Sequence, residues 1–404
     1  MVLSNSNSFP PSTVPLTVLV TAANGTQGYA LCSALASLSP GPRPLQIRAV
    51  VRDASSIKSQ RLVQLPQKYD TSQYTSVILT QADLTDVESL IRAFTPSIDG
   101  SAITAVFLNT VPTFHNAQEE VQHATAVLDA ARAAGSVRHV VYSSVVGIAD
   151  PQTFPLVGGP PAWVDPEAVT SLKPADVPSK ETMHFQSNLL RKGECEIDTD
   201  APTRKVLQGY FGAKAQIEFL VKNWRRDETA EDVSKTYTVL RPAWFMSNFL
   251  PPSSSNYWPE LLSSQPVLRS AMPKQARLML VDPADIGVVA AHALLDPING
   301  QTSPTLVNKI INVGSQALGL EEAARILSAV AGVHIGVEQV GEREAANEIR
   351  EGNVQRDAQA WALEKEDCFE PEDLSVIIGR KPGTFEAFLK GKKEESKAFF
   401  GRQG

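Results

Sequence analysis

Cysteine, basic charge and long apolar runs are all scarce in this chain of 404 residues. Its three cysteines, Cys32, Cys195 and Cys368, stand far apart and suit neither a disulfide framework nor a metal-binding spacing. The net charge of −7 disfavours a nucleic-acid or anionic-membrane surface, because both need clustered lysine and arginine. No apolar run is long enough to span a bilayer. We therefore expect a cytoplasmic enzyme or regulator with a small-molecule substrate, no metal, no nucleic-acid partner and no membrane attachment. The oligomeric state is unknown from the sequence.

The first residues are polar and rich in proline and serine, without the basic start and apolar core of a signal peptide, and we expect residues 1–15 to be a disordered leader. Beyond them, short apolar runs alternate with helical patterns, and the runs are apolar almost throughout, as in strands covered on both faces. Strands are predicted at residues 16–20, 45–51, 76–80, 103–108, 137–144, 237–241 and 309–314, and helices at 29–38, 86–94 and 115–135. This alternation predicts an α/β fold with a Rossmann-type, doubly wound parallel sheet.

Two regions break this alternation. Residues 149–205 are rich in Pro, Asp and Lys with little periodicity, which predicts an insertion or lid. Residues 315–404 are mainly helical in pattern, with one strand-like piece at 334–340 and a charged helix at the end, TFEAFLKGKKEESKAFF. We expect a nucleotide-binding domain over 16–314, in which 242–280 contributes to the substrate pocket, and a smaller C-terminal substrate-binding lobe after it.

The segment VTAANGTQG, residues 20–28, looks like a phosphate-binding turn between a strand and a helix. A dinucleotide needs backbone N–H groups aimed at its pyrophosphate and a helix N-terminus behind it. Gly25 would allow the close backbone approach, and Gly28 would let the helix pack near the strand. Ala22 replaces the usual first glycine, which is tolerable if its φ is negative. Alone, the motif suits a purely structural glycine turn about as well. The cofactor-binding candidates in it are Ala23, Asn24, Gly25, Thr26, Gln27 and Gly28.

The ends of the next two strands favour NADP(H) as the cofactor. An NAD enzyme commonly ends the second strand with Asp or Glu for the ribose 2′-hydroxyl, whereas an NADP enzyme places an arginine there. Here Arg52 comes first, with Lys58 nearby, and the guanidinium fork suits a 2′-phosphate. Asp53 is adjacent, so NAD stays open. Asp83 could face the adenine edge and Leu84 could pack on its ring, with a helix-capping or loop carboxylate as the alternative for Asp83.

Several segments together resemble the NmrA-like family of the atypical short-chain dehydrogenase/reductases. They are VTAANGTQG, AVVRD, QADLTDVESLIRAF, VRHVVYSSVVG, TVLRPAWFMSNF, LVDPADIGVVAAHALL and IIGRKPGTFEAFL. The resemblance covers roughly residues 16–147 and 206–404, and residues 149–205 are much longer than in typical members. The family contains true reductases, redox-sensing regulators without catalysis and enzymes of specialised metabolism, so the resemblance implies the fold without implying one activity.

The resemblance also implies a Tyr-x-x-x-Lys pair, which GYFGAKAQIEFL supplies as Tyr210 and Lys214. Residues four apart lie on one helix face. The lysine would hold the nicotinamide ribose, and its charge would lower the pKa of the tyrosine, which would exchange a proton with the substrate oxygen. Ser144, beside Ser143, would orient that oxygen. The alternatives are a surface Lys214 paired with Glu218, a packing aromatic at Tyr210 and serines that merely end the strand.

Two further groups of residues complete the predicted site. Asn109 and Thr110 follow the fourth strand, and we expect them to line the nicotinamide end or to form a turn. Aromatic residues near TVLRPAW suit a flat, apolar substrate, with core packing as the equal alternative. These substrate-binding candidates are Trp244, Phe245, Phe249 and Trp258.

The function predicted from these residues is NADPH-dependent reduction of a carbonyl, imine or conjugated double bond in a bulky apolar substrate of specialised metabolism. Two alternatives remain open. One is a redox-neutral cyclase or isomerase on the same scaffold, and the other is a non-catalytic NADP(H) sensor that binds a protein partner.

Overall fold

The computed structural model describes residues 14–38, 43–96, 100–113, 116–148, 202–224, 234–272, 276–297, 306–356, 358–359 and 372–400. Residues 1–13 of the predicted leader and 149–201 of the predicted insertion lie outside this described part. Helix α8 begins at Pro202, inside the range predicted as an insertion. Among the described helices, none has the length and apolar character that crossing a membrane requires.

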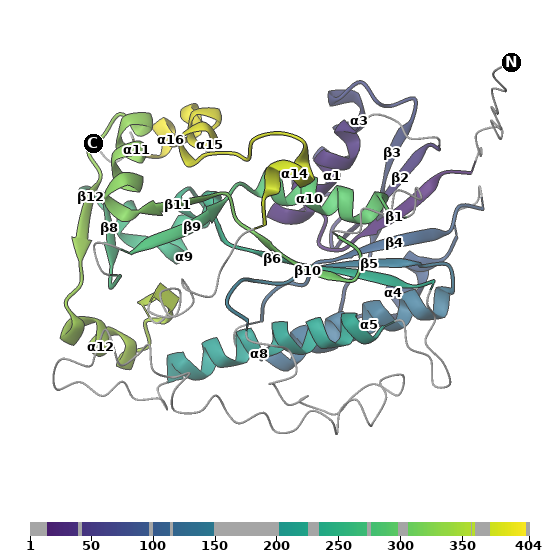
Figure 1. Cartoon of the computed structure of the whole chain (residues 1–404), viewed down its shortest axis with the longest axis horizontal. Coiled ribbons are helices and arrows are strands. Elements are labelled where there is room, and N and C mark those ends of the chain that lie inside the picture. Colours follow the sequence, from purple (N-terminus) through teal and green to yellow (C-terminus); the bar gives the residue numbers. More distant parts are fainter. Residues whose placement is uncertain are drawn as a thin grey trace, which may run out of the picture.

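A seven-stranded parallel sheet forms the centre of the molecule (Figure 1). Its strands are, in spatial order, β3 (Thr75–Gln81), β2 (Leu45–Val51), β1 (Leu16–Val20), β4 (Ile103–Leu108), β5 (His139–Ser143), β6 (Thr236–Pro242) and β10 (Lys309–Val313). Each neighbouring pair is parallel. The strand order reverses between β1 and β4, which is the point where ligands bind in open α/β sheets. The predicted Rossmann-type sheet is confirmed, with strand ends within two residues of those expected.

Helices cover both faces of this sheet (Figure 1). On one face lie α1 (Thr26–Ser37), α10 (Pro283–Leu295) and α14 (Leu374–Ile378), and on the other α4 (Val87–Phe94), α5 (Ala117–Ala134) and α8 (Pro202–Asn223). The short helices α2 (Ile57–Val63) and α3 (Leu65–Lys68) connect β2 to β3. Successive strand residues point to opposite faces, so Val18 and Val20 join the core under α1 while Leu19 joins the core under α5.

A smaller lobe lies beyond one end of the sheet, at the left of Figure 1. Its strands are β7 (Trp244–Phe245), β8 (Val267–Ser270), β9 (Arg277–Val281), β11 (Gln316–Gly319) and β12 (Gly336–Gln339). Its helices are α9 (Ser254–Tyr257), α11 (Leu320–Ala331), α12 (Glu342–Arg350), α15 (Phe385–Gly391) and α16 (Lys393–Phe400), with 3₁₀ turns η2 (Met246–Phe249) and η3 (Pro259–Leu262). The mainly helical C-terminal lobe is confirmed, and it also carries two small sheets, β11–β9–β7 and β12–β8, that were not predicted.

Local sequence signals mark some of the helix ends. Helix α5 ends at Gly135, whose φ of 67° is the left-handed conformation that glycine adopts at helix ends. The C-terminal segment predicted as one helix forms two helices, α15 and α16, with the break between Gly391 and Lys393. Thr384 begins the first of them by accepting a hydrogen bond from the backbone N–H of Ala387 at 3.2 Å.

Candidate nucleotide-binding and catalytic site

The glycine turn joins β1 directly to the N-terminus of α1. The Gly25 N–H donates to the Ala22 carbonyl at 2.9 Å and closes the turn. Gly25 is also the N-cap of α1, and no side chain caps the helix there. A Cβ on Gly28 would stand 2.4 Å from the Ala22 oxygen, so the helix packs against the turn as closely as was predicted for a dinucleotide site. The first amides of α1 therefore remain available for an anion.

Ala22 differs from the expectation set for it. Its φ is 47°, in the left-handed region, so the proposed condition of a negative φ is wrong. This conformation costs a non-glycine residue about 1–2 kcal/mol. The turn is held in place by the Ala23 N–H, which donates to Val50 at 3.0 Å, and by Asn24 Nδ2, which donates to Ser59 Oγ at 3.0 Å. These bonds tie the turn to β2 and α2.

The two basic candidates for the 2′-phosphate, Arg52 and Lys58, are both exposed. Asp53 is held within its own loop, because its Oδ1 accepts from Ser55 Oγ at 2.6 Å and from the Ser55 N–H at 2.8 Å. These two bonds hold the pKa of the Asp53 carboxyl below its usual value. One of the two carboxylate oxygens of Asp53 is thus already engaged by its own turn.

Asp83, at the end of β3, is also a loop carboxylate. Its Oδ1 accepts from the Thr85 N–H at 2.9 Å and from Thr85 Oγ1 at 2.8 Å. These bonds, with a smaller contribution from the positive charge of Arg52, hold the pKa of Asp83 below its usual value. Leu84 is half-buried beside the core under α5. The structure brings Arg52 and Asp83 near each other, as expected for the ends of adjacent strands.

Lys214 is buried on α8 and does not lie on the surface. Its Nζ is 2.8 Å from Glu120 Oε1 and 3.4 Å from Thr110 Oγ1, and the Thr110 hydroxyl donates to the same Glu120 oxygen at 2.6 Å. The side chains of Lys214 and Glu120 are only 5% and 1% exposed. The alternative of a surface lysine paired with Glu218 is wrong, because Glu218 is buried and its carboxylate binds the guanidinium of Arg241 at 2.9 and 2.6 Å.

Tyr210 lies on the same helix as Lys214, with its ring centre 5.8 Å from Nζ, and the ring centre of Tyr142 lies at the same distance. Burial raises the pKa of Tyr210 well above its usual value, and the nearby Tyr257 and Glu120 raise it further. The implied lowering of this pKa by Lys214 is therefore wrong for this structure. The physical reason is that the Glu120 carboxylate balances the ammonium charge while burial disfavours the phenolate.

The two serines after β5 face different surroundings. Ser143 Oγ donates to Gln27 Oε1 at 2.5 Å, toward α1. The Ser144 N–H donates to Leu240 at 2.8 Å, and its buried Oγ has no hydrogen-bond partner within the described part of the chain. Since side chains alternate along a strand, Ser144 falls on the same face as Tyr142. A buried hydroxyl without a partner is uncommon, and one in this place suits the predicted role of orienting a substrate oxygen.

Asn109 and Thr110 have different roles at the end of β4. The Asn109 N–H donates to Thr21 Oγ1 at 2.7 Å, and that hydroxyl donates to the Asn109 carbonyl at 2.8 Å, so this segment links β4 to β1. Thr110 belongs to the cluster around Lys214. Both residues are buried near the carboxyl ends of β1 and β4, where the strand order of the sheet reverses.

Two of the four predicted substrate aromatics lie in the core of the C-terminal lobe. Trp258 and Phe249 are 0% and 1% exposed and stack with ring centres 5.4 Å apart. Phe249 also packs on Phe385 at 4.8 Å. Their assignment as substrate contacts is contradicted by this burial, because neither ring has a surface on which a ligand could rest. Both rings pack in the core of the lobe, which was the alternative stated for them.

The other two aromatics, Trp244 and Phe245, are half-buried. Trp244 meets Tyr257 edge to face at 5.4 Å. Tyr257 is half-buried and close enough to Tyr210 to raise the pKa of its phenol. Trp244 of β7 is thus connected through Tyr257 of α9 and Tyr210 of α8 to the cluster around Lys214. Tyr257 is an additional candidate for the substrate site.

Sequence reasoning missed Glu120, although a signal for it exists. Glu120 lies on the apolar stripe of α5, four residues before Ala124 and seven and eight before Val127 and Leu128, all buried. A carboxylate on such a stripe requires a buried partner of opposite charge or a set of hydrogen-bond donors. Tyr142 was also missed, since nothing in an apolar strand distinguishes a phenol near a site from one in the core.

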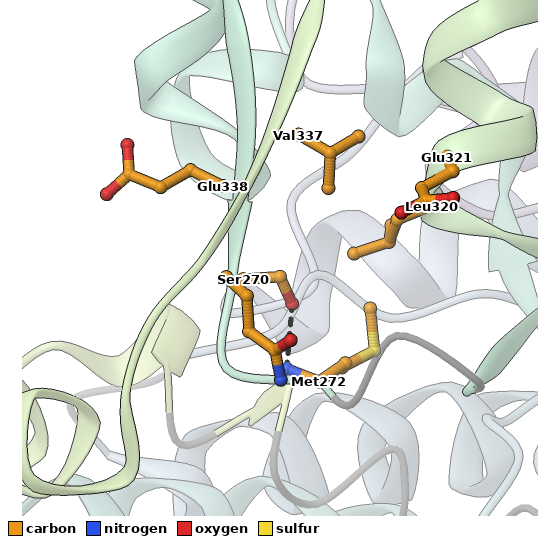
Figure 2. Close-up of a pocket in the computed structure, with 7 residues that line it drawn as sticks. Ser270, Met272, Leu320, Glu321, Val337 and Glu338 are labelled. Atoms are coloured by element: carbon orange, nitrogen blue, oxygen red, sulfur yellow. Dashed lines mark hydrogen bonds between the residues drawn. The ribbon is translucent and has the colours of Figure 1, made fainter.

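A small cavity of about 60 Å³ lies elsewhere, in the C-terminal lobe (Figure 2). It is lined by Ser270, Met272, Leu320, Glu321, Val337, Glu338 and Gln339. None of these residues was named as a site candidate, although Ser270 and Met272 lie in the range predicted to contribute to the substrate pocket and the others lie in the predicted substrate-binding lobe. The cavity has room for a few water molecules but not for a bulky metabolite.

Comparisons with known proteins match part of the chain to a family model. Residues 16–156 match the model of the NmrA-like family. An agroclavine dehydrogenase of Claviceps fusiformis is 30% identical over 175 residues, which are 41% of this chain and 56% of that protein. The chain thus matches little more than half the length of this relative.

Solved structures resemble nearly the whole chain in fold. NmrA, a negative transcriptional regulator, in complex with NADP gives a TM-score of 0.56 at 16% identity over 95% of this chain and 97% of that one. Leucoanthocyanidin reductase of Vitis vinifera in complex with NADPH gives 0.54 at 13% identity, over 94% and 99%. Identities this low show the fold alone. The match to the NmrA-like family model covers residues 16–156, where the glycine turn and the strand ends of the site lie, and it agrees with the resemblance that the motifs indicated.

Proposed function

We propose that the protein binds NADP(H) at the carboxyl edge of the sheet and reduces a carbonyl, imine or conjugated double bond in a bulky apolar substrate. The observation that carries this proposal is the buried Lys214 ammonium beside the Tyr210 ring, together with Ser144 directly after β5, whose buried hydroxyl has no partner among the described residues. A buried ammonium, a phenol beside it and a hydroxyl without a partner are the groups that such a reduction uses.

The residues of the turn and of β2 fit a phosphorylated dinucleotide. The uncapped N-terminus of α1 suits a pyrophosphate, and the absence of a side chain at Gly28 keeps that helix close to β1. Arg52 and Lys58 are exposed at this edge, where a 2′-phosphate would lie, while Ser55 engages one carboxylate oxygen of Asp53, the residue that would favour NAD. When bound, the reduced nicotinamide would supply the hydride.

Tyr210 would act as the proton donor. Its raised pKa keeps the phenol protonated at neutral pH, and the alkoxide or amide anion that hydride addition creates is a stronger base than a phenolate. The phenol O–H bond breaks as the substrate oxygen or nitrogen gains the proton. The phenolate left behind lies near the Lys214 ammonium and regains its proton from water. Ser144 Oγ would donate to the substrate oxygen and so fix its position.

The relatives support an oxidoreductase, because one is named a dehydrogenase and another a reductase. A non-catalytic NADP(H) sensor is the second candidate. It is favoured by the charge balance of Lys214 with Glu120 and by the raised pKa of Tyr210, since neither is the arrangement that activates a tyrosine. The resemblance in fold to a transcriptional regulator agrees with it.

Cofactor titration followed by turnover assays distinguishes these functions. NADPH and NADH are titrated by tryptophan fluorescence, and nicotinamide absorbance is then followed against a panel of ketones, imines and enones. A reductase binds NADPH and consumes it with a member of the panel. A sensor binds it without consumption and is unaltered by Tyr210→Phe. No binding of either nucleotide would overturn both functions.

A further inference from the structure

Glu120 is a buried carboxylate that no sequence motif assigned to the site. We propose that Glu120 is a positioning residue of the site, the counter-ion that keeps Lys214 charged despite its burial and holds the ammonium between Thr110 and the Tyr210 ring. The inference rests on the proposed function, because it places Glu120 behind the group that would hold the nicotinamide ribose.

The position of Lys214 Nζ is fixed by side chains from two other elements. Glu120 on α5 provides an oxygen at 2.8 Å, and Thr110 after β4 provides one at 3.4 Å. The Thr110 hydroxyl in turn donates to the same Glu120 oxygen at 2.6 Å, which fixes both partners relative to each other. A lysine side chain has four rotatable bonds and rarely holds one position without such contacts. Glu120 therefore determines where the ammonium stands.

The charge of Lys214 depends on the same contact. Desolvation favours the neutral amine of a buried lysine, and a carboxylate at hydrogen-bonding distance favours the ammonium. The titratable groups around this point are Glu120 on α5, Tyr142 on β5, Tyr210 and Glu218 on α8 and, beyond Tyr210, Tyr257 on α9. The Glu218 carboxylate accepts two hydrogen bonds from Arg241, and the groups other than the two glutamates are tyrosine phenols. Among the described residues, Glu120 is thus the carboxylate that balances Lys214.

Glu120→Gln tests this role because it removes the charge and keeps the shape and the hydrogen bond to Thr110. The full chain without cofactor is labelled with [ε-¹³C]lysine, and the Lys214 resonance is identified by its loss in Lys214→Met. We expect the change of this resonance with pH to occur at lower pH in Glu120→Gln than in the wild type, because the neighbouring carboxylate charge is lost. Glu119→Gln, an exposed neighbour that contacts Asn116, is the matched control and should behave as the wild type.

NADPH affinity gives a second readout. In Glu120→Gln the amine loses its charge as the pH rises, so the ratio of the variant Kd to the wild-type Kd should increase at least about threefold between pH 6 and 9. A residue that only supported the fold would change this ratio equally at every pH. In Glu120→Gln/Lys214→Met the ratio should be independent of pH.

The outcomes separate this inference from the proposed function. A Lys214 resonance that changes over the same pH range in the wild type and in a folded Glu120→Gln protein overturns the role of Glu120. If the Gln variant does not fold, Glu120→Asp decides the question, because it keeps the carboxylate and must leave the resonance close to that of the wild type. Failure to bind NADPH would overturn the proposed function and leave the cofactor-free titration valid.

Discussion

The carbonyl oxygen of Ala22 occupies the place where a side chain on Gly28 would begin, since a Cβ there would be 2.4 Å from that oxygen and 2.7 Å from the Ala23 Cα. Gly28→Ala should therefore lower the free energy of unfolding by about 1–3 kcal/mol and abolish NADPH binding, because α1 must move away from β1. Gly391→Ala is the control, because a Cβ at that position would meet no atom within 4 Å and the residue lies outside the proposed cofactor site. Urea denaturation and NADPH titration measure both effects, and an unchanged Gly28→Ala protein would contradict the close packing.

A substitution at Ala22 should have the opposite effect on the free energy of unfolding. Its φ of 47° is strained for alanine, so Ala22→Gly should raise the free energy of unfolding by about 0.5–1 kcal/mol, even after the extra freedom of glycine in the unfolded chain. Ala133→Gly, at an exposed position in α5, should instead lower it by about 0.5–1 kcal/mol. Equal losses in both variants, measured by urea denaturation, would show that the turn is not strained at Ala22.

Arg52 is expected to decide between NADPH and NADH. Arg52→Ala should reduce the preference for NADPH by about 10- to 100-fold, because a charge-assisted contact with the 2′-phosphate is lost while the rest of the nucleotide still binds. Lys58→Ala should have a smaller effect, since a single ammonium lacks the two-pronged geometry of the guanidinium. The measurement is the ratio of the two dissociation constants. A preference for NADPH that survives Arg52→Ala would show that Arg52 does not determine it.

Tyr210 is expected to act in turnover and not in cofactor binding. Tyr210→Phe should lower kcat by about 100-fold or more and leave the Kd of NADPH unchanged. Because the pKa of Tyr210 is raised, its protonated donor form persists as the pH increases, and kcat should show no loss up to about pH 9 from this group. Tyr74→Phe, at an exposed tyrosine, is the control. Full turnover in Tyr210→Phe would favour the sensor over the reductase.

The aromatic residues of the lobe should divide into two classes. Phe249→Ala removes a ring that is fully buried against Trp258 and Phe385, and should lower the free energy of unfolding by about 3–5 kcal/mol. Trp244→Ala removes a half-buried ring, should cost less stability, and should raise KM if that ring contacts the substrate. Denaturation and steady-state kinetics on the two variants test the division. A larger loss of stability from Trp244→Ala would contradict it.

His139 should make stability depend on pH. Burial lowers its pKa from 6.5 to about 3, and its ring nitrogens lie 2.7 Å from Thr236 Oγ1 and 3.3 Å from Thr238 Oγ1. A neutral ring is therefore required in the folded state. Its contribution is complete above pH 6.5 and is lost as the pH falls, by about 1.4 kcal/mol per unit, because the unfolded chain binds the proton more readily.

His139→Gln isolates that contribution. The difference in unfolding free energy between the wild type and this variant should shrink steadily between pH 6.5 and 4.5 in urea denaturation experiments. Other groups titrate equally in both proteins and cancel in the difference. A difference that stayed constant over this range would show that the folded protein accommodates a charged His139.

Much of the central fold could be predicted from the sequence, because parallel strands covered on both faces must be apolar throughout. The runs at 16–20 and 45–51 have this property, and they are β1 and β2 with the predicted bounds. Among the short strands of the lobe, β12 was predicted by the strand-like piece at 334–340, whereas β7 could not be predicted, since it has only two residues and carries no periodicity. The candidate site divides in the same way. Tyr210 and Lys214 share a helix face by spacing alone, whereas the burial of Phe249 depends on the distant Phe385.

The sequence by itself determined the order of strands and helices, the glycine turn and the four-residue spacing of Tyr210 and Lys214, because each is a local property of the chain. The tertiary structure alone decided that Lys214 pairs with Glu120 and leaves Glu218 to Arg241. Which carboxylate pairs with Lys214 depends on which helices lie side by side on the sheet. Helix α5 packs against α8, although the two are far apart in the sequence, and no periodic pattern in the sequence indicates this contact. Buried charges select partners by proximity in space, and only the packed fold defines that proximity.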